Sequence, residues 1–272
     1  MPENDKSATT ISILGRKMVQ LAEISWSQAD KLRKETDLVI LPVGSTEQHG
    51  PHNPLGTDHL IAGAFAKVVG DRVKVPVLPV IPVGVSEHHR QFTGSLWVPP
   101  EVFREYVLQV SLAASSHGFR KILIFNGHGG NTPSLIEVAG DLRRKHGIFS
   151  AVLMTFPPGL DGHAGAGETS MNLYYHGHLV HMEDAVDTVQ NEKLGPIPIT
   201  GMSKLGSFEY PWDTIDLTPT GVLGGAGKLI VSKTASRERG ESMMLPFTEE
   251  VIKIVKEIKS ARVEELLSKP HV

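Results

Sequence analysis

Short apolar runs rich in β-branched residues alternate with stretches of helical periodicity along the chain up to residue 155. The runs predict strands over residues 38–43, 77–83, 121–125 and 149–155. The stretches between them predict helices over residues 60–69, 99–116 and 132–145. This alternation is typical of βαβ units, so the sequence predicts an α/β fold with a mainly parallel sheet flanked by helices. Pro79 and Pro82 indicate that the second strand is irregular or lies at an edge.

The second half of the chain is organised differently. Residues 183–240 are rich in Gly, Pro and Thr and show little periodicity, which predicts a loop-rich excursion rather than a linker. Residues 249–267 predict an amphipathic helix that closes the chain. Its apolar face is expected to comprise Val251, Ile254, Val255, Ile258 and Leu266. We therefore expect one domain over residues 1–272.

Composition excludes several classes of function. The 27 Lys and Arg residues do not exceed the 30 Asp and Glu residues, so nothing indicates a nucleic-acid surface. The chain has no cysteine, which excludes disulfides, cysteine-ligated zinc and thiol nucleophiles. The first six residues, MPENDK, are unlike a signal peptide, and the most apolar stretch, 75–85, is too short to span a membrane. We expect no membrane contact, with the cytoplasm as the default location.

Polar, glycine-rich clusters follow each of the four predicted strands. They are STEQHGPH at 45–52, SEHH at 86–89, NGHGGN at 126–131 and GHAGAGETS at 162–170. Ligands of parallel α/β sheets bind at the carboxyl ends of the strands, and glycine allows the backbone to approach a ligand closely. The four clusters therefore predict a single site.

The clusters, together with Asp58 just before the helix predicted over 60–69, supply candidate metal ligands without sulfur: Glu47, His49, Asp58, His128 and Glu168. Glu47 and His49 are two apart, so in extended backbone both face one cavity. Taken singly, Asp58 or Glu168 would also suit a helix start, and His128 a structural hydrogen bond. Together they favour a site for zinc, manganese or iron(II), in which a carboxylate can bridge two ions.

The chain resembles the creatininase (creatinine amidohydrolase) family. The resemblance rests on PVGSTEQHGPH at 42–52 with Thr57-Asp58, on NGHGGN at 126–131, and on His163-Ala164-Gly165 with Glu168-Thr169-Ser170. It covers roughly residues 20–182, with Thr220-Gly221-Val222 and Gly240-Glu241 near the end. It implies a three-layer fold of a parallel sheet flanked by helices, two divalent metal ions per chain, and a homo-oligomer, often a hexamer. It also implies hydrolysis of a cyclic amide or a related bond.

The resemblance implies a division of the ligands into two sets. Glu47, Asp58 and His128 match the ligands of one ion, while His49, the bridging Asp58 and Glu168 match those of the other. Creatininase itself has a Glu two residues after the motif histidine. This chain has Gly130 there, which counts against creatinine itself as the substrate.

The ligand set and the resemblance together predict a mechanism. A metal-bound hydroxide attacks a polarised carbonyl, and the leaving atom takes up a proton. His163 matches the family histidine that donates this proton, and Glu168 is the alternative acid or base. The loop 86–94 matches the family's substrate side loosely, which makes His88 and His89 candidate substrate contacts. Trp212 is a third candidate substrate contact.

Several alternatives remain open. One competing class, the Ser-His-Asp hydrolases, is excluded because the chain lacks their G-x-S-x-G elbow. A non-catalytic metal-binding module on the same fold is an alternative to an enzyme. Within the enzyme class, the substrate is a small cyclic amide, a formylaminopyrimidine nucleotide, a small peptide or an inositol-derived cyclic diketone. The segment 194–212, with Phe208, Tyr210 and Trp212, is a lid over the substrate, an oligomer contact, or a cluster packed on the chain's own core.

Overall fold

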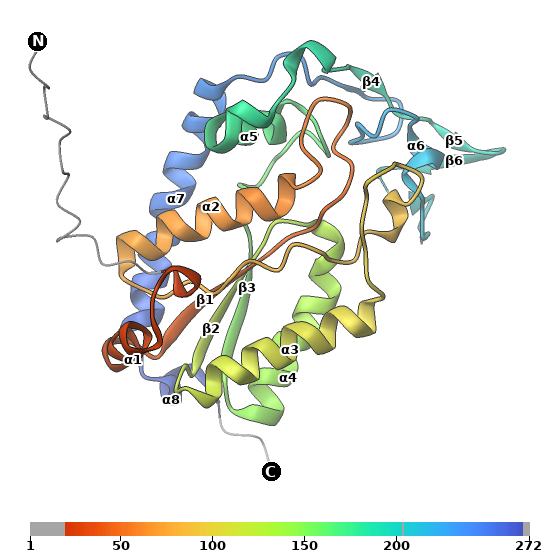
Figure 1. Cartoon of the computed structure of the whole chain (residues 1–272). Coiled ribbons are helices and arrows are strands. Elements are labelled where there is room, and N and C mark those ends of the chain that lie inside the picture. Colours follow the sequence, from red (N-terminus) through yellow and green to blue (C-terminus); the bar gives the residue numbers. More distant parts are fainter. Residues whose placement is uncertain (1–19, 203, 269–272) are drawn as a thin grey trace, which may run out of the picture.

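A parallel three-stranded sheet forms the centre of the computed structural model, which describes residues 20–202 and 204–268 (Figure 1). Its strands are β1 (Leu38–Val43), β2 (Lys121–Asn126) and β3 (Phe149–Met154), in that spatial order. Lys121 pairs with Leu38 on one side and with Phe149 on the other. The strands agree with the predicted runs to within one residue, and the predicted parallel sheet is confirmed.

Helices cover both faces of this sheet (Figure 1). One face packs against α2 (Thr57–Val73), α5 (Ala166–His176) and α7 (Arg237–Ser260). The other packs against α3 (Pro100–Ser116) and α4 (Thr132–His146). Strands buried on both faces read as continuous apolar runs, which is why β1 and β2 lack polar alternation. The predicted three-layer α/β fold is confirmed.

The remaining elements are short. The helical ones are η1 (Leu21–Glu23), α1 (Trp26–Glu35), η2 (Glu87–His89), η3 (Gly129–Asn131), η4 (Gly177–Leu179), η5 (Met182–Asp184), α6 (Thr214–Leu217) and α8 (Val263–Leu266). The strands are β4 (Thr188–Val189), β5 (Lys193–Leu194), β6 (Ile197–Thr200), β7 (Lys204–Leu205), β8 (Phe208–Glu209) and β9 (Leu229–Ile230).

Two predicted elements differ from the structure. Residues 77–83 form only isolated parallel bridges to β1, at Val77 and Ile81, because the prolines between and beyond them cannot donate to a ladder. The predicted closing helix 249–267 is wrong at both ends. α7 begins at Arg237, inside the segment predicted as loops, and the chain leaves helical geometry at Ala261 before α8. Ile254, placed on the buried face, is exposed.

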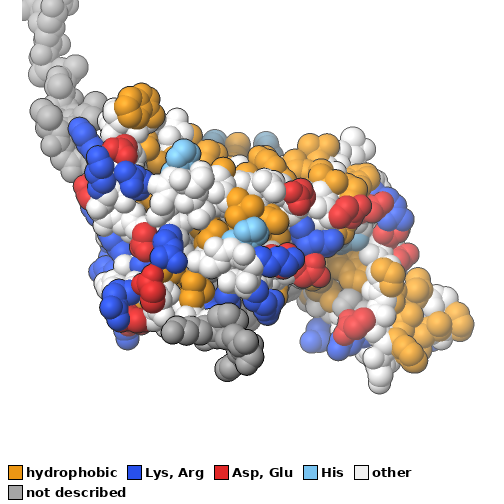
Figure 2. Space-filling view, turned by 90° about the horizontal axis from the view of Figure 1, so that it is seen from below, with side chains coloured by type: hydrophobic (Ala, Val, Ile, Leu, Met, Phe, Trp, Pro, Cys, Tyr) orange, Lys and Arg blue, Asp and Glu red, His pale blue; other side chains and the backbone are white. Residues whose placement is uncertain are grey.

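The loop-rich excursion projects beyond the three layers (Figure 1, right). It contains the small antiparallel sheet β5-β6-β7-β8. In the space-filling view, hydrophobic side chains gather on its outer surface (Figure 2, right). Phe208 is 77% exposed, and Ile197 is exposed as well.

Within residues 20–202 and 204–268, none of the helices combines the length and the apolar composition that crossing a bilayer requires. The polar hexapeptide MPENDK lies outside the described residues.

Candidate metal centre

The five predicted metal ligands meet at the carboxyl end of the central sheet. Glu47 and His49 lie in the loop after β1, and Asp58 lies in the first turn of α2. His128 follows β2 directly, and Glu168 lies in the first turn of α5. All five side chains are buried. The parallel strands end at one edge, and this shared edge brings together residues far apart in the sequence.

Glu47, Asp58 and His128 form one group. His128 Nδ1 lies 3.2 Å from Glu47 Oε1 and 3.2 Å from Asp58 Oδ2. Ligand atoms about 2.1 Å from one tetrahedral ion lie about 3.4 Å apart, so this spacing fits a shared cation.

A second group adjoins the first. His49 Nε2 lies 3.1 Å from Asp58 Oδ1 and 3.6 Å from Glu168 Oε1. Asp58 therefore turns one carboxylate oxygen toward each group, which is the arrangement expected of a carboxylate between two ions.

Main-chain carbonyls orient both histidine rings. His49 Nδ1 lies 3.2 Å from the main-chain oxygen of Glu47, and His128 Nε2 lies 3.0 Å from that of Val85. A carbonyl can only accept, so these nitrogens donate, and the opposite nitrogens face the carboxylates. Metal-binding histidines are commonly oriented by such a bond.

The carboxylates make the centre strongly attractive to positive charge. Burial lowers the pKa of His49, but Asp58 and Glu168 outweigh it and hold the pKa well above its usual value. Burial also lowers the pKa of His128, and there Glu47 and Asp58 raise it well above the usual range. With pKa values this high, each ring holds a proton between itself and the carboxylates at neutral pH. A divalent cation can take the place of these protons.

Unpaired carboxylate oxygens support the same conclusion. Within the described part of the chain, Glu47 Oε1 and Oε2 and Asp58 Oδ2 are buried without a hydrogen-bond donor. Buried polar atoms are normally paired, and an unpaired buried charge is costly. The residues present therefore fit divalent cations.

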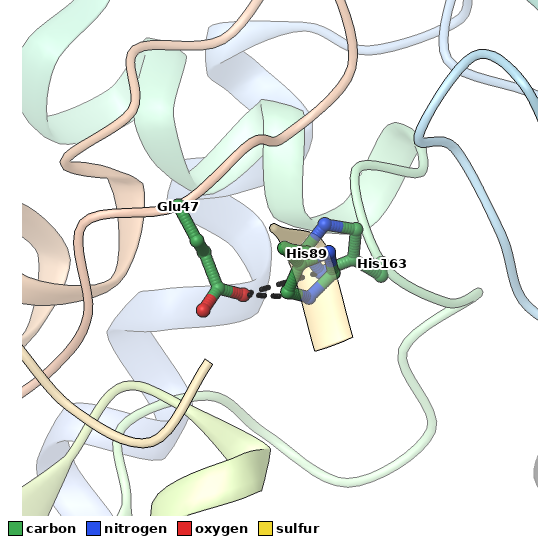
Figure 3. Close-up of side chains that lie close together, drawn as sticks. All are labelled: Glu47, His89 and His163. Carbon is green, nitrogen blue, oxygen red and sulfur yellow. Dashed lines mark ion pairs between the residues drawn. The ribbon is translucent and has the colours of Figure 1, made fainter. Parts of the chain in front are cut away.

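His89 and His163 lie on the same side of Glu47, with their rings toward its carboxylate (Figure 3). His89 Nε2 is 3.1 Å from Glu47 Oε1, and His163 Nδ1 is 4.0 Å from the same oxygen. Burial, followed by His49 and His89, holds the pKa of His163 well below its usual value, so this ring is neutral at neutral pH. His89 was predicted to contact the substrate; the structure places it 1% exposed against a predicted metal ligand.

Gln48 is a site residue that sequence reasoning missed. Its amide nitrogen lies 2.9 Å from His89 Nδ1 and 2.9 Å from His163 Nε2. In extended backbone, the residue between Glu47 and His49 points away from them, so the spacing argument for these two ligands assigned no role to Gln48.

A cavity of about 580 Å³ opens above these groups. Asp58, His88, His89, His128, His163 and Glu168 line its polar floor. Its outer wall comprises Phe156, Leu160, Met202, Tyr210, Pro211 and Trp212. Among the described residues that line it, none is Lys or Arg. The predicted substrate contacts His88, His89 and Trp212 thus all line the cavity. The rings of His88 and Trp212 pack edge to face, with their centroids 4.8 Å apart.

Polar contacts attach the excursion to the loop that carries His88. Arg90 forms a bidentate ion pair with Asp213. Thr214 Oγ1 donates to the main-chain oxygen of His88 over 3.0 Å. These contacts hold Trp212 over the cavity, so the excursion forms part of its wall.

A match to a protein-family model tests the resemblance that the sequence motifs indicated. The model of the Creatininase family, described as creatinine amidohydrolase, matches residues 22–255. The chain belongs to the creatininase family. It is therefore a member of a family of hydrolases, and the predicted resemblance is confirmed.

Individual relatives in the creatininase family carry different activities in their names. The mycofactocin precursor peptide peptidase of Mycobacterium tuberculosis (strain CDC 1551 / Oshkosh) is 30% identical over 68% of this chain and 75% of the relative. The 3-dehydro-scyllo-inosose hydrolase of Thermotoga maritima is 27% identical over 88% and 84%. The creatinine amidohydrolase of Pseudomonas putida is 27% identical over 84% and 92%. The family thus fixes hydrolysis but not the substrate.

Solved creatininase structures share the fold. A crystal structure of creatinine amidohydrolase superposes with a TM-score of 0.75 at 24% identity, covering 90% of this chain and 100% of that one. A manganese creatininase gives a TM-score of 0.72 at 24% identity, covering 89% and 99%.

Gly130 marks a difference from creatininase that the structure explains. A Cβ at Gly130 would lie 2.6 Å from the main-chain oxygen of Val85 and would also overlap the ring of His128. The hydrogen bond between His128 and Val85 therefore leaves no room for the Glu that the resemblance places there. Glu168 reaches the second group from α5 instead.

Proposed function

We propose that the chain is a metal-dependent hydrolase that splits an amide or a related carbonyl bond of a small molecule. Glu47, Asp58 and His128 hold one divalent ion, and His49, Asp58 and Glu168 hold a second. The observation that carries this proposal is Asp58, whose two oxygens face two different histidines at 3.1 and 3.2 Å.

Zinc, manganese or iron(II) held by these ligands would polarise a carbonyl oxygen and lower the pKa of a water molecule to about 7. Around that chemistry, the chain must orient the substrate and move one proton from the attacking water to the leaving atom. A buried and neutral histidine suits this transfer because it can accept a proton before it donates one.

We assign the proton transfer to His163. The ring centroids of His163 and His49 lie 4.2 Å apart. His163 also lines the cavity. Pairing with Leu223 holds its main chain on both sides, at 2.7 and 3.1 Å. Glu168 suits the role less well, because its Oε2 accepts the N–H of Ala164 over 2.6 Å while its Oε1 faces His49.

The cavity indicates the kind of substrate. Its aromatic and aliphatic outer wall favours an uncharged molecule with an apolar or aromatic group beside the amide. The absence of Lys and Arg among the described lining residues disfavours a nucleotide, because phosphates call for basic partners. An inositol-derived ketone would leave hydroxyl groups unpaired against the apolar wall.

Trimming of a peptide end is a second candidate. A volume of about 580 Å³ exceeds what a single small ring needs, and a peptide side chain would fill the outer part. The peptidase name of the Mycobacterium tuberculosis relative points the same way.

The excursion also supports a homo-oligomer. Phe208, 77% exposed, and Ile197 lie on strands that project beyond the three layers. Apolar side chains gathered on a projecting surface commonly mark a contact with another chain.

A substrate panel tests the activity. Lactams, formamides, cyclic ketones and short peptides, each with and without an aromatic group, are incubated with protein loaded with zinc, manganese or iron(II). Hydrolysis of an amide that is lost with Asp58→Asn supports the proposal. Metal-free protein that hydrolyses equally well contradicts it, as does protein that binds no divalent metal.

A further inference from the structure

Asn131 occupies the N-cap position of α4 but does not cap this helix with its side chain. Asparagine is favoured at this position because its side-chain oxygen usually accepts a main-chain N–H of the first helical turn. The Asn131 side chain makes no such bond, and it is fully buried. Its amide is directed instead toward other segments, so capping does not explain the residue.

The amide of Asn131 joins three loops at the carboxyl end of the sheet. Its Oδ1 accepts the N–H of Val85 over 2.8 Å. Its Nδ2 donates to the main-chain oxygen of Gly44 over 3.0 Å, and to Oδ1 of Asn126 over 3.3 Å. A main-chain N–H can only donate and a main-chain oxygen can only accept, so these partners fix the orientation of the amide.

Two of these partners hold His128, a proposed ligand. The main-chain oxygen of Val85 lies 3.0 Å from His128 Nε2 and supports the ring. Asn126 holds the main chain, because its Oδ1 accepts the N–H of His128 over 3.1 Å and its Nδ2 donates to the oxygen of His128 over 2.7 Å. Asn131 therefore fixes the supports of both the ring and the main chain of His128 without being a ligand itself.

Gly84 leaves the space that this arrangement needs. A Cβ at Gly84 would overlap Asn131 Oδ1 and would lie 2.8 Å from the main-chain oxygen of Gly44. Gly44 precedes Glu47, another proposed ligand, by three residues. A side chain at position 84 would therefore displace the amide of Asn131 from the contacts that join the loops.

We propose that Asn131 is a positioning residue that holds His128 in place for the ion of the group Glu47, Asp58 and His128. The proposal rests on the metal centre of the proposed function. His49 in the second group is supported within its own loop, by the main-chain oxygen of Glu47. Loss of the Asn131 amide should consequently weaken the first ion more than the second.

Asn131→Leu tests this role, because leucine has a similar size and neither a donor nor an acceptor. Competition with a chelator measures the zinc affinities of the full chain, and anomalous diffraction at the zinc edge shows which group keeps its ion. We expect the affinity at Glu47, Asp58 and His128 to fall about 10- to 100-fold, the usual effect of removing an outer support. The ion of the second group should remain.

Asn172→Leu is the matched control. Asn172 is also fully buried, but its amide donates to the side chains of Asn53 and Thr57. The variant loses buried hydrogen bonds as Asn131→Leu does, so it controls for a general loss of stability. It should keep the wild-type affinity for the first ion.

Gly84→Ala tests the same contacts while leaving Asn131 unchanged. The new methyl group should displace the Asn131 amide and cause the same selective loss of the first ion. Gly63→Ala is its control, since a Cβ at Gly63 in α2 meets no packing neighbour within 4 Å. In the metal-free wild type, the amide hydrogen of Val85 should exchange slowly with solvent, because Asn131 accepts it.

The outcomes separate this proposal from the hydrolase function. An unchanged first ion in Asn131→Leu overturns the role of Asn131, even where two ions bind and an amide is hydrolysed. An equal loss in Asn172→Leu overturns it too. Selective loss of the first ion in a protein without hydrolytic activity would support Asn131 and remove the proposed function. If Asn131→Leu does not fold, Gly84→Ala decides, and rapid exchange of the Val85 amide hydrogen in the wild type would overturn the proposal.

Discussion

Asp58 Oδ2 lies 3.2 Å from His128 Nδ1, although one residue begins a helix and the other follows a strand. The close approach depends on Gly127, where a Cβ would lie 2.8 Å from the main-chain carbon of Asp58. Any other residue at this position would push the β2 loop away from α2. The glycines of the NGHGGN motif therefore determine how closely the two predicted ligands meet.

Asp58→Asn is expected to remove the bridge between the two ions. An amide supplies one neutral oxygen in place of two charged ones, so bound metal should fall from about two ions per chain to fewer than one. Metal analysis after dialysis measures this. Asp187→Asn is the control, because the Asp187 carboxylate is exposed and accepts only from main-chain N–H groups. Full metal content in Asp58→Asn would show that Asp58 does not bridge.

Gly130→Ala tests the support behind His128. The new methyl group would lie 2.6 Å from the oxygen of Val85 and displace the His128 ring, so metal affinity should fall about 10- to 100-fold. Gly129→Ala is a neighbouring control, since a Cβ there meets no atom within 4 Å. Competition with a chelator gives both affinities. Equal affinities would mean that the hydrogen bond to Val85 does not matter for the metal.

The fold and the grouping of the five candidate ligands were predictable because both depend on local patterns. Continuous apolar runs mark strands buried on both faces, and Glu47 and His49 follow one of them directly. The helix start at Arg237 was missed because its first turns, Arg-Glu-Arg-Gly-Glu, carry almost no apolar periodicity. Ser236 caps this start by accepting the N–H of Arg239, and Gly240 lets α7 pack closely against the main chain of Ser170.

The places of Gln48 and His89 in the site could not be predicted for a different reason. Both depend on contacts between segments far apart in the sequence, such as those from Gln48 to Gly221 and from His89 to Thr214. Spacing within a motif carries no information about partners of this kind. The composition of the cavity wall could not be predicted either, because Met202 and Phe156 lie in no recognisable sequence motif.

His88 should make the protein less stable in acid. Burial, followed by the nearby His89, lowers the pKa of His88 to about 3, against about 6.5 in an unfolded chain. Below pH 6.5 the unfolded state takes up a proton that the folded state refuses, so stability falls as the pH falls. Between pH 7 and pH 5, the wild type should lose about 1–2 kcal/mol more than His88→Gln.

Urea unfolding of the two proteins at both pH values measures that difference. His117→Gln, which removes an exposed histidine, is the control for a change in histidine number. An identical loss in the wild type and in His88→Gln would contradict the assignment of a low pKa to His88.

Phe208→Glu tests the surface of the excursion. Burying this side chain in a contact between chains would contribute about 1.5–3 kcal/mol, and a carboxylate there would oppose the contact. We expect the wild type to form a homo-oligomer and Phe208→Glu to shift toward the monomer mass of 29.6 kDa in light scattering. Trp26→Glu is the control, because Trp26 is equally exposed but lies on α1. A monomeric wild type would contradict the oligomer.

His163→Asn and His49→Asn should separate proton transfer from metal binding. His163 belongs to neither proposed ligand set, so His163→Asn should retain both ions while turnover falls about 10²- to 10⁴-fold, the usual loss with a general acid or base. His49→Asn should lose metal and activity together, because Asp58 Oδ1 and Glu168 Oε1 then lose the ring nitrogen that both face. Metal analysis and turnover, measured on the same samples, distinguish the two.

The leaving group makes this comparison sharper. If His163 carries the proton to the leaving atom, the loss in His163→Asn should shrink for a substrate whose leaving group departs without a proton. Loss of metal in His163→Asn would instead make His163 a ligand, consistent with its place within 4.8 Å of the ligand atoms of His49 and Glu168. Wild-type turnover would make it structural, and Glu168, despite its bond to Ala164, would then be the group to test next.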